Sequence, residues 1–307
     1  MNADALVLVA TIADAGSLTM AARQLGVSQS ALTKQLLKIE ADTGVPLFTR
    51  GVRGVRLTDY GQALIPRARA IREEARRAGE TLQQLRGQRE GQVVLALSHL
   101  PVMVWLPQII GRFRAQWPAV SLRIMAPAFP LLLSYLREGT LDFAVIASPA
   151  EQLGPEYSVH PLYGSSTIIA ATRKKHPLAS ARRLKELGGA QWATPSAFSS
   201  SSRALRRAYA AARLGEPECP VHCETLSGLE AIVHSTDLIG TFPHELFALR
   251  WPANGLMPLQ LEETLESPSI ALISWGDAQP TPAAAFLAEL FTQAAHASAR
   301  AARPQRA

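Results

Sequence analysis

The sequence predicts a multidomain chain in which a small α-helical unit is joined by one long helix to a larger α/β unit. Three observations lead to this prediction. The 307 residues exceed what a single hydrophobic core usually supports. Apolar residues follow helical spacing up to about residue 88, whereas beyond it strand-like apolar runs alternate with helical ones. A charged stretch over 59–88, with a single proline near its start, separates the two patterns.

Charge and composition limit the partners and the location. The 31 Lys and Arg against 25 Asp and Glu give a net charge of +6 and a pI near 9.7, which suits a polyanionic partner. Residues 1–91 hold 13 of these basic and 9 of the acidic side chains, so the excess is concentrated there. The apolar segment Leu6–Ala13 lacks the basic start of a signal peptide, and Val93–Ile110 is interrupted by histidine and prolines. We expect a cytoplasmic protein with no membrane partner.

The two cysteines leave one alternative to weigh. Cys219 and Cys223 flank His222, and this spacing could belong to a metal or redox site. A zinc site normally needs four ligands, and no second ligand pair accompanies them. We therefore expect free structural thiols, no metal and no cofactor, in a reducing compartment.

Three short helices are predicted within residues 1–58, over Leu6–Ala13, Leu18–Leu25 and from Gln29 to about Glu40. The tight turn at Gly26 between the second and third predicts a helix-turn-helix. An ordinary solvent-facing amphipathic pair has the same pattern. The polar face of the third helix and its N-cap carry side chains suited to a major groove. These candidate DNA contacts are Ser28, Gln29, Ser30, Thr33 and Lys34.

Three arginines then recur every third residue, at Arg50, Arg53 and Arg56. Gly51 and Gly54 indicate turns between short extended pieces, as in a two-stranded wing. Guanidinium groups on such a wing can enter a minor groove or bind phosphates. A solvated basic loop is the alternative. Together with the helices, this pattern predicts a winged helix-turn-helix domain over 1–58 that binds double-stranded DNA.

Residues 59–88 predict one long helix, about 45 Å at 1.5 Å per residue. Its apolar residues alternate in steps of four and three, the repeat of a coiled-coil seam. They are Leu64, Ala68, Ile71, Ala75, Ala78, Leu82 and Leu85. Packing against the protein's own body is the alternative, but so regular a stripe favours a second copy. We therefore predict a linker helix that forms a dimer.

Residues 89–297 predict a bilobal α/β domain similar to periplasmic binding proteins. Strand and helix patterns alternate, which indicates largely parallel sheets covered by helices. The predicted elements include helices over Ser180–Leu187 and Leu226–Ser235, and strands over Val221–Glu224 and Ile270–Trp275. Lobe I is assigned to 92–162 and 269–297, and lobe II to 163–268. The last residues, 298–307, are predicted to be a disordered basic tail.

Ligands of such domains bind where strand ends and helix N-termini face a crevice. The candidate effector contacts at these positions are Ser98, His99, Leu100, Ala147, Ser148, Thr194, Ser196, Phe198, Ser199, Thr241 and Phe242. For each serine, a helix cap is the alternative role. Their hydroxyls and the free backbone N–H groups at the helix starts could bind an anion, although no arginine stands among these residues.

Other functional classes fit less well. The sequence has no Gly-x-Ser-x-Gly, Walker loop or His-Glu-x-x-His, and its histidines are scattered, so we do not expect an enzyme. A transport receptor could share the bilobal design but would lack the DNA-binding unit. A purely architectural DNA-binding protein would not need a crevice.

The chain resembles the LysR-type transcriptional regulators over nearly its whole length. The N-terminal likeness lies in AARQLGVSQSALTKQ (21–35), GVPLFTR (44–50) and VRLTDYG (55–61), and the C-terminal likeness in LREGTLDFA (136–144) and DLIGTFP (237–243). The resemblance implies promoter DNA, a small-molecule effector, dimers through the linker helix that pair into tetramers, and contact with RNA polymerase.

Two further features qualify this resemblance. The family commonly has proline, serine and arginine where this chain has Ser30, Thr33 and Lys34, so the preferred DNA sequence is expected to differ. RGQREG (86–91) and VHSTDL (233–238) resemble a subgroup that includes regulators of aromatic sulfonate catabolism, which implies an aromatic organic anion as effector.

Overall fold

The N-terminal part is a compact helical unit followed by a long helix. The computed structural model describes residues 1–51, 54–147, 153–164, 167–250, 255–276 and 278–301. The first elements are α1 (Ala3–Ala15), α2 (Leu18–Leu25), α3 (Gln29–Thr43), β1 (Phe48–Gly51), β2 (Gly54–Leu57) and α4 (Asp59–Leu85). The predicted second helix is confirmed to the residue, and the wing is confirmed as an antiparallel β1–β2 pair.

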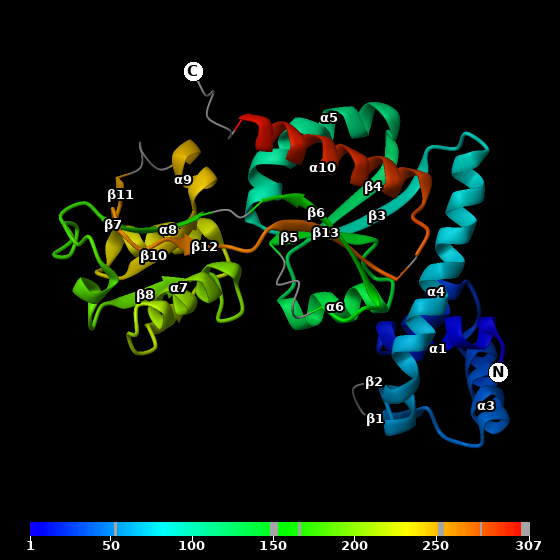
Figure 1. Cartoon of the computed structure of the whole chain (residues 1–307). Coiled ribbons are helices and arrows are strands. Elements are labelled where there is room, and N and C mark those ends of the chain that lie inside the picture. Colours follow the sequence, from blue (N-terminus) through cyan, green and yellow to red (C-terminus); the bar gives the residue numbers. More distant parts are fainter. Residues whose placement is uncertain (52–53, 148–152, 165–166, 251–254, 277, 302–307) are drawn as a thin grey trace.

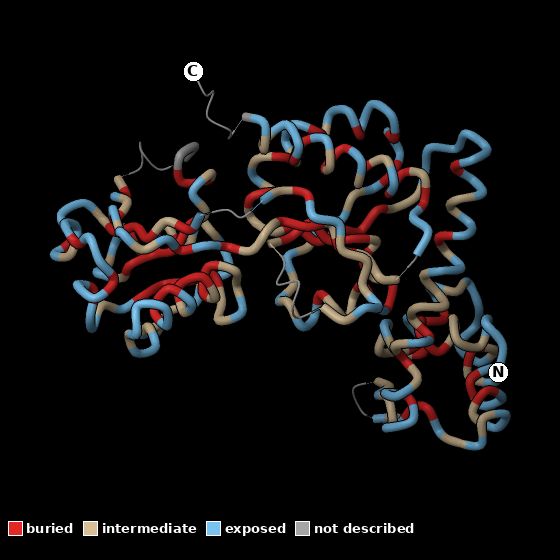
Figure 2. The backbone as a smooth tube through the Cα atoms, in the orientation of Figure 1, coloured by how far each residue is buried: buried red, intermediate tan, exposed pale blue. Residues whose placement is uncertain are grey.

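Lobe I contains a five-stranded sheet in the order β4-β3-β5-β13-β6. Its elements are β3 (Glu90–Leu97), η1 (Pro101–Trp105), α5 (Leu106–Gln116), β4 (Ala119–Met125), α6 (Phe129–Arg137), β5 (Phe143–Ala147), β6 (Tyr157–Tyr163), β13 (Ile270–Trp275) and α10 (Pro282–Ala301). Helices α5 and α10 cover one face of the sheet and α6 covers the other (Figure 1). The buried side chains form two clusters, one with α5 and α10 and the other with α6. In Figure 2 the buried backbone segments, in red, are concentrated in the strands of this sheet.

Lobe II contains a second sheet, ordered β11-β7-β10-β8-β9, with β12 also paired to β7. Its elements are β7 (Thr167–Arg173), η3 (Leu184–Leu187), β8 (Gln191–Thr194), α7 (Ser200–Ala211), β9 (Glu218–His222), α8 (Leu226–Ser235), β10 (Ile239–Pro243), α9 (His244–Arg250), β11 (Leu256–Pro258) and β12 (Leu265–Glu266). The two-lobed α/β architecture is thus as predicted.

The sheets are mixed rather than largely parallel. In lobe I, β3 pairs in parallel with β4 and β5, but β13 runs antiparallel to both its neighbours. In lobe II, β7 is antiparallel to β10 and β11. The prediction of largely parallel sheets was wrong because the alternation of strands and helices along the sequence does not fix the direction of strands that return to a sheet from a distant part of the chain, such as β13. Strand β6 was also not recognised from the sequence. It lies at the sheet edge and holds Pro161 beside a register shift, which is where a sheet tolerates proline.

Two local predictions in lobe II also need correction. The helix expected over Ser180–Leu187 is only the short 3₁₀ turn at Leu184–Leu187, because the carboxylate of Glu263 accepts the Leu184 N–H at 3.1 Å from outside. The strand expected over Val221–Glu224 begins earlier, at Glu218. Pro220 is accommodated because β9 is an edge strand.

The predicted tail begins too early. Helix α10 runs on to Ala301, and the indole nitrogen of the buried Trp105 donates to the Ser298 hydroxyl at 2.9 Å. Residues 302–307 of the predicted tail lie outside the described residues. Among the described residues, no helix has both the length and the apolar character needed to cross a membrane.

The predicted seam of the linker helix divides into two parts. Ala68 is fully buried and Leu64 packs beside it in the core of the N-terminal unit, so these positions serve the chain itself. The end of the helix behaves differently, since Leu82 and Leu85 are 60% and 72% exposed. The alternative of packing on the protein's own body is therefore correct for the first half of the seam alone.

Candidate functional site

The exposed face of α3 is held ready by short polar contacts. Ser28 caps the helix, because its hydroxyl accepts the Ala31 N–H at 3.2 Å. Its hydroxyl also lies 3.1 Å from that of Ser30. The hydroxyl of Thr19, on α2, donates to the Gln29 side-chain oxygen at 3.1 Å. This contact orients an amide of the kind that can pair with adenine in a major groove.

Burial separates the two faces of α3 as predicted. Leu32, Leu36 and Ile39 are buried in the core of the N-terminal unit. Gln29, Ser30 and Lys34 are exposed, and Thr33 is half-buried. The polar residues are thus available to a partner along one stripe of the helix.

The wing is fixed to the body at both of its strands. The Glu40 carboxylate, from α3, accepts the Leu47 and Phe48 N–H groups at 2.7 and 3.0 Å. On β2, the Val55 N–H donates to the Gly16 carbonyl at 3.0 Å. Gly54 has φ +116°, and a Cβ there would lie 2.3 Å from the Gly16 oxygen, so glycine is required.

The three wing arginines differ in what the structure describes. Arg56 is exposed on β2, opposite Thr49. The backbone of Arg50 pairs with Val55 on β1. Arg53 lies outside the described residues. The exposed cation of Arg56 suits a polyanionic partner.

A cavity of about 390 Å³ lies between the two lobes and is the candidate effector site. It opens at the carboxyl end of β3 and β5 on one side and at the N-terminus of α7 on the other. Seven predicted contacts line it: Ser98, His99, Leu100, Ala147, Ser196, Phe198 and Ser199. Strand ends and a helix start thus converge there, as the sequence suggested.

Of the other four predicted contacts, three are described, and these three do not line the cavity. Ser148 lies outside the described residues. Thr194 is buried, and its hydroxyl lies 2.9 Å from the His222 ring nitrogen. Thr241 and Phe242 are fully buried on β10, where the ring of Phe242 packs against Phe247. These three side chains are packed inside lobe II and do not line the cavity.

The loop before α7 presents the helix N-terminus to the cavity. Ser199 is the N-cap, and its hydroxyl accepts the Ser202 N–H at 3.1 Å, so the capping role is correct for this serine. Ser200 and Ser201, in the first turn, line the cavity. The amides of a first helical turn favour a bound anion.

An arginine reinforces this positive end of lobe II and was missed from sequence. Arg203 lines the cavity, and its guanidinium donates to the Phe198 carbonyl. Arg206 donates to the Ala197 carbonyl at 2.7 Å, so both arginines hold the loop against α7. Arg203 could have been found from the sequence, because it lies near the start of a helix whose N-terminus was predicted to face the crevice.

His99 links the lobes across the cavity. Its Nε2 lies 3.3 Å from the backbone oxygen of Glu224 in lobe II. Burial lowers the pKa of His99, while the hydrogen bond to Glu224 acts in the opposite direction. The neutral imidazole is therefore favoured. Phe129, which the sequence reasoning also missed, adds an aromatic surface to the lobe I wall.

The metal or redox site that the two cysteines suggested is the remaining candidate. In the part of the chain that is described, no three potential ligands form a metal-binding group. Cys219 and Cys223 are free thiols, and burial raises the pKa of Cys219, which disfavours the reactive thiolate.

A winged helix-turn-helix unit with an exposed polar recognition face, joined to a two-lobed unit that encloses a cavity, defines a ligand-responsive DNA-binding regulator. Two family models match: "Bacterial regulatory helix-turn-helix protein, lysR family" over residues 3–62 and "LysR substrate binding domain" over residues 86–295. The chain belongs to the LysR family of DNA-binding transcription regulators with an effector-binding domain.

Named relatives are regulators. The chain is 34% identical over 175 residues to the "Probable hydrogen peroxide-inducible genes activator" of Mycobacterium xenopi, covering 57% of this chain and 91% of that protein. It is 35% identical over 178 residues to the protein of the same name in Mycobacterium avium, covering 56% of this chain and 55% of that protein. Neither relative is named as an enzyme.

A solved structure shares the complete fold. The structure of full-length CbnR complexed with its target DNA has a TM-score of 0.66 and 22% identity, covering 96% of this chain and 100% of that chain. This likeness supports the order of DNA-binding unit, helix and two-lobed domain seen here.

Proposed function

We propose that this regulator binds promoter DNA in the cytoplasm through α3 and the wing, and that a small organic anion in the inter-lobe cavity controls its binding or activation of transcription. The observation that carries the effector assignment is the junction of the α7 N-terminus with the cavity. Helix-turn amides and the Arg203 guanidinium meet an otherwise mostly apolar space there.

The lining favours an anion that also has an apolar body. Phe129 and Phe198 offer ring surfaces, and Phe198 is 61% exposed. Ring stacking beside an anion site suits aromatic carboxylates and sulfonates. This chemistry agrees with the sequence likeness to regulators of aromatic sulfonate catabolism.

Two copies would bind DNA together. The free end of the linker seam, Ala75, Ala78, Leu82 and Leu85, is exposed and keeps the spacing of a coiled coil. A dimer through this surface would present two recognition helices to two half-sites, and a pair of dimers would form a tetramer. Contact with RNA polymerase would then link occupancy to transcription.

Thermal unfolding of the full chain against a panel of benzoate, benzenesulfonate and aliphatic carboxylates tests the effector assignment. A binding anion should raise the melting temperature, because it binds the folded state alone. Arg203→Gln should weaken this stabilisation. Arg207→Gln, four residues on in α7, is the matched control and should leave it unchanged. Equal stabilisation by the neutral analogue benzamide, or a full response in Arg203→Gln, would contradict the proposal.

The DNA assignment is tested on duplexes selected by the full chain from a random library. Gln29→Ala should change the selected sequence, because a base contact is lost. Arg56→Ala and Arg53→Ala should weaken binding to all sequences and lower the salt dependence of the affinity, because phosphate contacts are lost. Unchanged affinity in both arginine variants would refute the role of the wing.

A further inference from the structure

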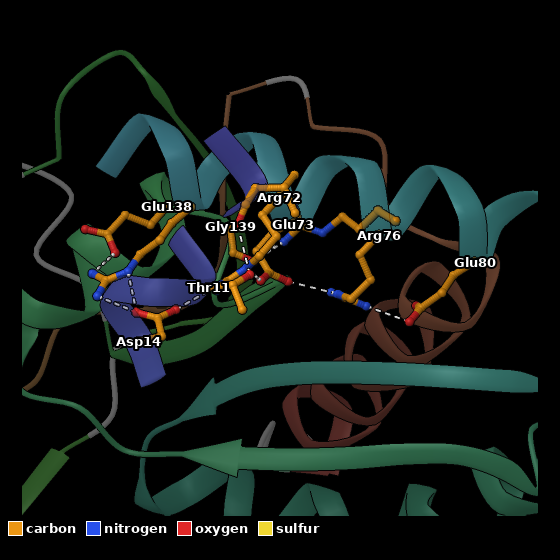
Figure 3. Close-up of polar contacts among 11 residues, drawn as sticks. Thr11, Asp14, Arg72, Glu73, Arg76, Glu80, Glu138 and Gly139 are labelled. Atoms are coloured by element: carbon orange, nitrogen blue, oxygen red, sulfur yellow. Dashed lines mark hydrogen bonds and ion pairs between the residues drawn. The ribbon is translucent and has the colours of Figure 1, made fainter. Parts of the chain in front are cut away.

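Helix α6 reaches from the cavity to the linker helix. Phe129 and Leu132 in its first turn, and Ala128 just before it, line the cavity. Its other end is followed by Glu138 and Gly139, which contact α4 (Figures 1 and 3). Helix α6 and the turn that follows it therefore connect the candidate effector site with the segment that carries the DNA-binding unit.

The contact with α4 is anchored by a buried arginine. Arg77 is 8% exposed, and its guanidinium donates to the Gly139 carbonyl at 2.7 Å and to the Leu141 carbonyl at 3.2 Å. It also donates to the Asp142 carboxylate at 2.9 Å, whose other oxygen accepts the Val94 N–H at 2.8 Å. The linker helix is thus bonded to the turn after α6 and, through Asp142, to strand β3 of lobe I.

A second arginine joins three parts of the chain. Arg69 on α4 donates to Glu138 at 3.1 Å and to Asp14, the next-to-last residue of α1, at 2.7 Å (Figure 3). Arg72 adds a 2.8 Å ion pair to Asp14. Burial disfavours the charge on Arg69, but its hydrogen bonds and ion pairs with Asp14 and Glu138 outweigh this effect and raise its pKa. Lobe I, the linker and the DNA-binding unit therefore meet at one guanidinium.

The turn after α6 is tightly packed against α4. Gly139 has φ +72°, and a Cβ there would lie 3.0 Å from the Glu73 Cβ and 3.3 Å from the Arg77 guanidinium. The backbone after α6 thus lies directly against α4. A displacement of α6 cannot be absorbed by a gap at its C-terminal end.

We propose that α6 is a relay that couples the occupancy of the cavity to the orientation of α1, through Glu138 and Arg69. This inference rests on the proposed effector site, since it assigns the route by which that site acts. The relay runs within one chain, and its end point is the helix that precedes the helix-turn-helix. Coupling between two such residues is measured directly by the non-additivity of their variants.

Amide hydrogen exchange on the full chain, without ligand or DNA, tests the relay. Phe129→Ala perturbs α6 at the cavity end and should change exchange in the last turn of α1 by roughly threefold or more. Leu131→Ala, on the exposed side of the same helix, is the matched control and should not. If Phe129→Ala leaves α6 itself unchanged, Leu132→Ala supplies the perturbation.

The decisive experiment combines the cavity variant, Phe129→Ala or Leu132→Ala, with Glu138→Gln. This second substitution removes the charge of Glu138 and keeps the shape of its side chain. The effect of the cavity variant on α1 should disappear in this background, while Glu262→Gln, which removes an equal charge from an exposed pair in lobe II, should preserve it. An equal effect with and without Glu138, or a changed α6 with an unchanged α1, would overturn the relay. Failure of the anion panel would instead refute the effector assignment, because this experiment uses no ligand.

Discussion

Replacing Arg77 with methionine should destabilise lobe I strongly. Methionine preserves the packing of the aliphatic stem but removes three hydrogen bonds, and it leaves the Asp142 carboxylate, whose side chain is 3% exposed, without its cation. Removing one partner of a buried pair costs about 3–5 kcal/mol. For a domain of about 200 residues this lowers the melting temperature by roughly 6–20 °C.

The measurement is calorimetric unfolding of the full chain, with exchange of the β3 amides to identify the transition of lobe I. Arg77→Met/Asp142→Leu should recover most of the loss, because both charges are then absent. Arg183→Met is the matched control, since its pair with Glu262 is exposed and should matter little. A loss below about 1 kcal/mol in Arg77→Met would refute the assignment of a buried anchor.

Three further outcomes follow from single sites. Gly61→Ala should lower both the melting temperature and the DNA affinity, since its Cβ would lie 2.2 Å from the Leu47 oxygen; unchanged affinity would contradict this. Burial lowers the pKa of His99 from its ordinary 6.5, so the unfolded chain binds more protons and the stability of the protein falls as the pH drops below that value. His99→Gln should reduce this pH dependence in calorimetric scans. An unchanged pH dependence in the variant would contradict the assignment. Leu82→Glu with Leu85→Glu should yield monomers in light scattering, and persistent dimers would exclude this surface.

Most of the helices and strands could be predicted from residues that lie close together in the sequence. Ser28 and Gly26 mark helix boundaries by capping chemistry, which depends on residues a few positions apart. Regular periodicity likewise located α8 and β13 to the residue. Interactions between residues far apart in the sequence could not be predicted in this way. Strand β6 forms through its pairing with β13, and the Leu184 N–H is bound by the distant Glu263.

The candidate site divides along the same line. Ser98 and Ser199 were found because strand ends and helix starts predict a crevice. Thr241 and Phe242 lie at a strand end too, but their side chains point into the core of lobe II. Which side chains at a strand end face the cavity depends on how the two lobes pack together. This packing cannot be predicted from a local sequence pattern.

The linker helix shows how one periodic stripe can serve two purposes. Leu64 and Ala68 satisfy the repeat within the N-terminal core, whereas Leu82 and Leu85 leave it open to a partner. Between them, Arg69 and Arg77 use another face of the same helix to hold lobe I. Because one continuous helix carries all three contacts, a displacement of α4 caused by lobe I would also move the surface that would meet a second copy. The angle between two DNA-binding units would then depend on the state of the cavity.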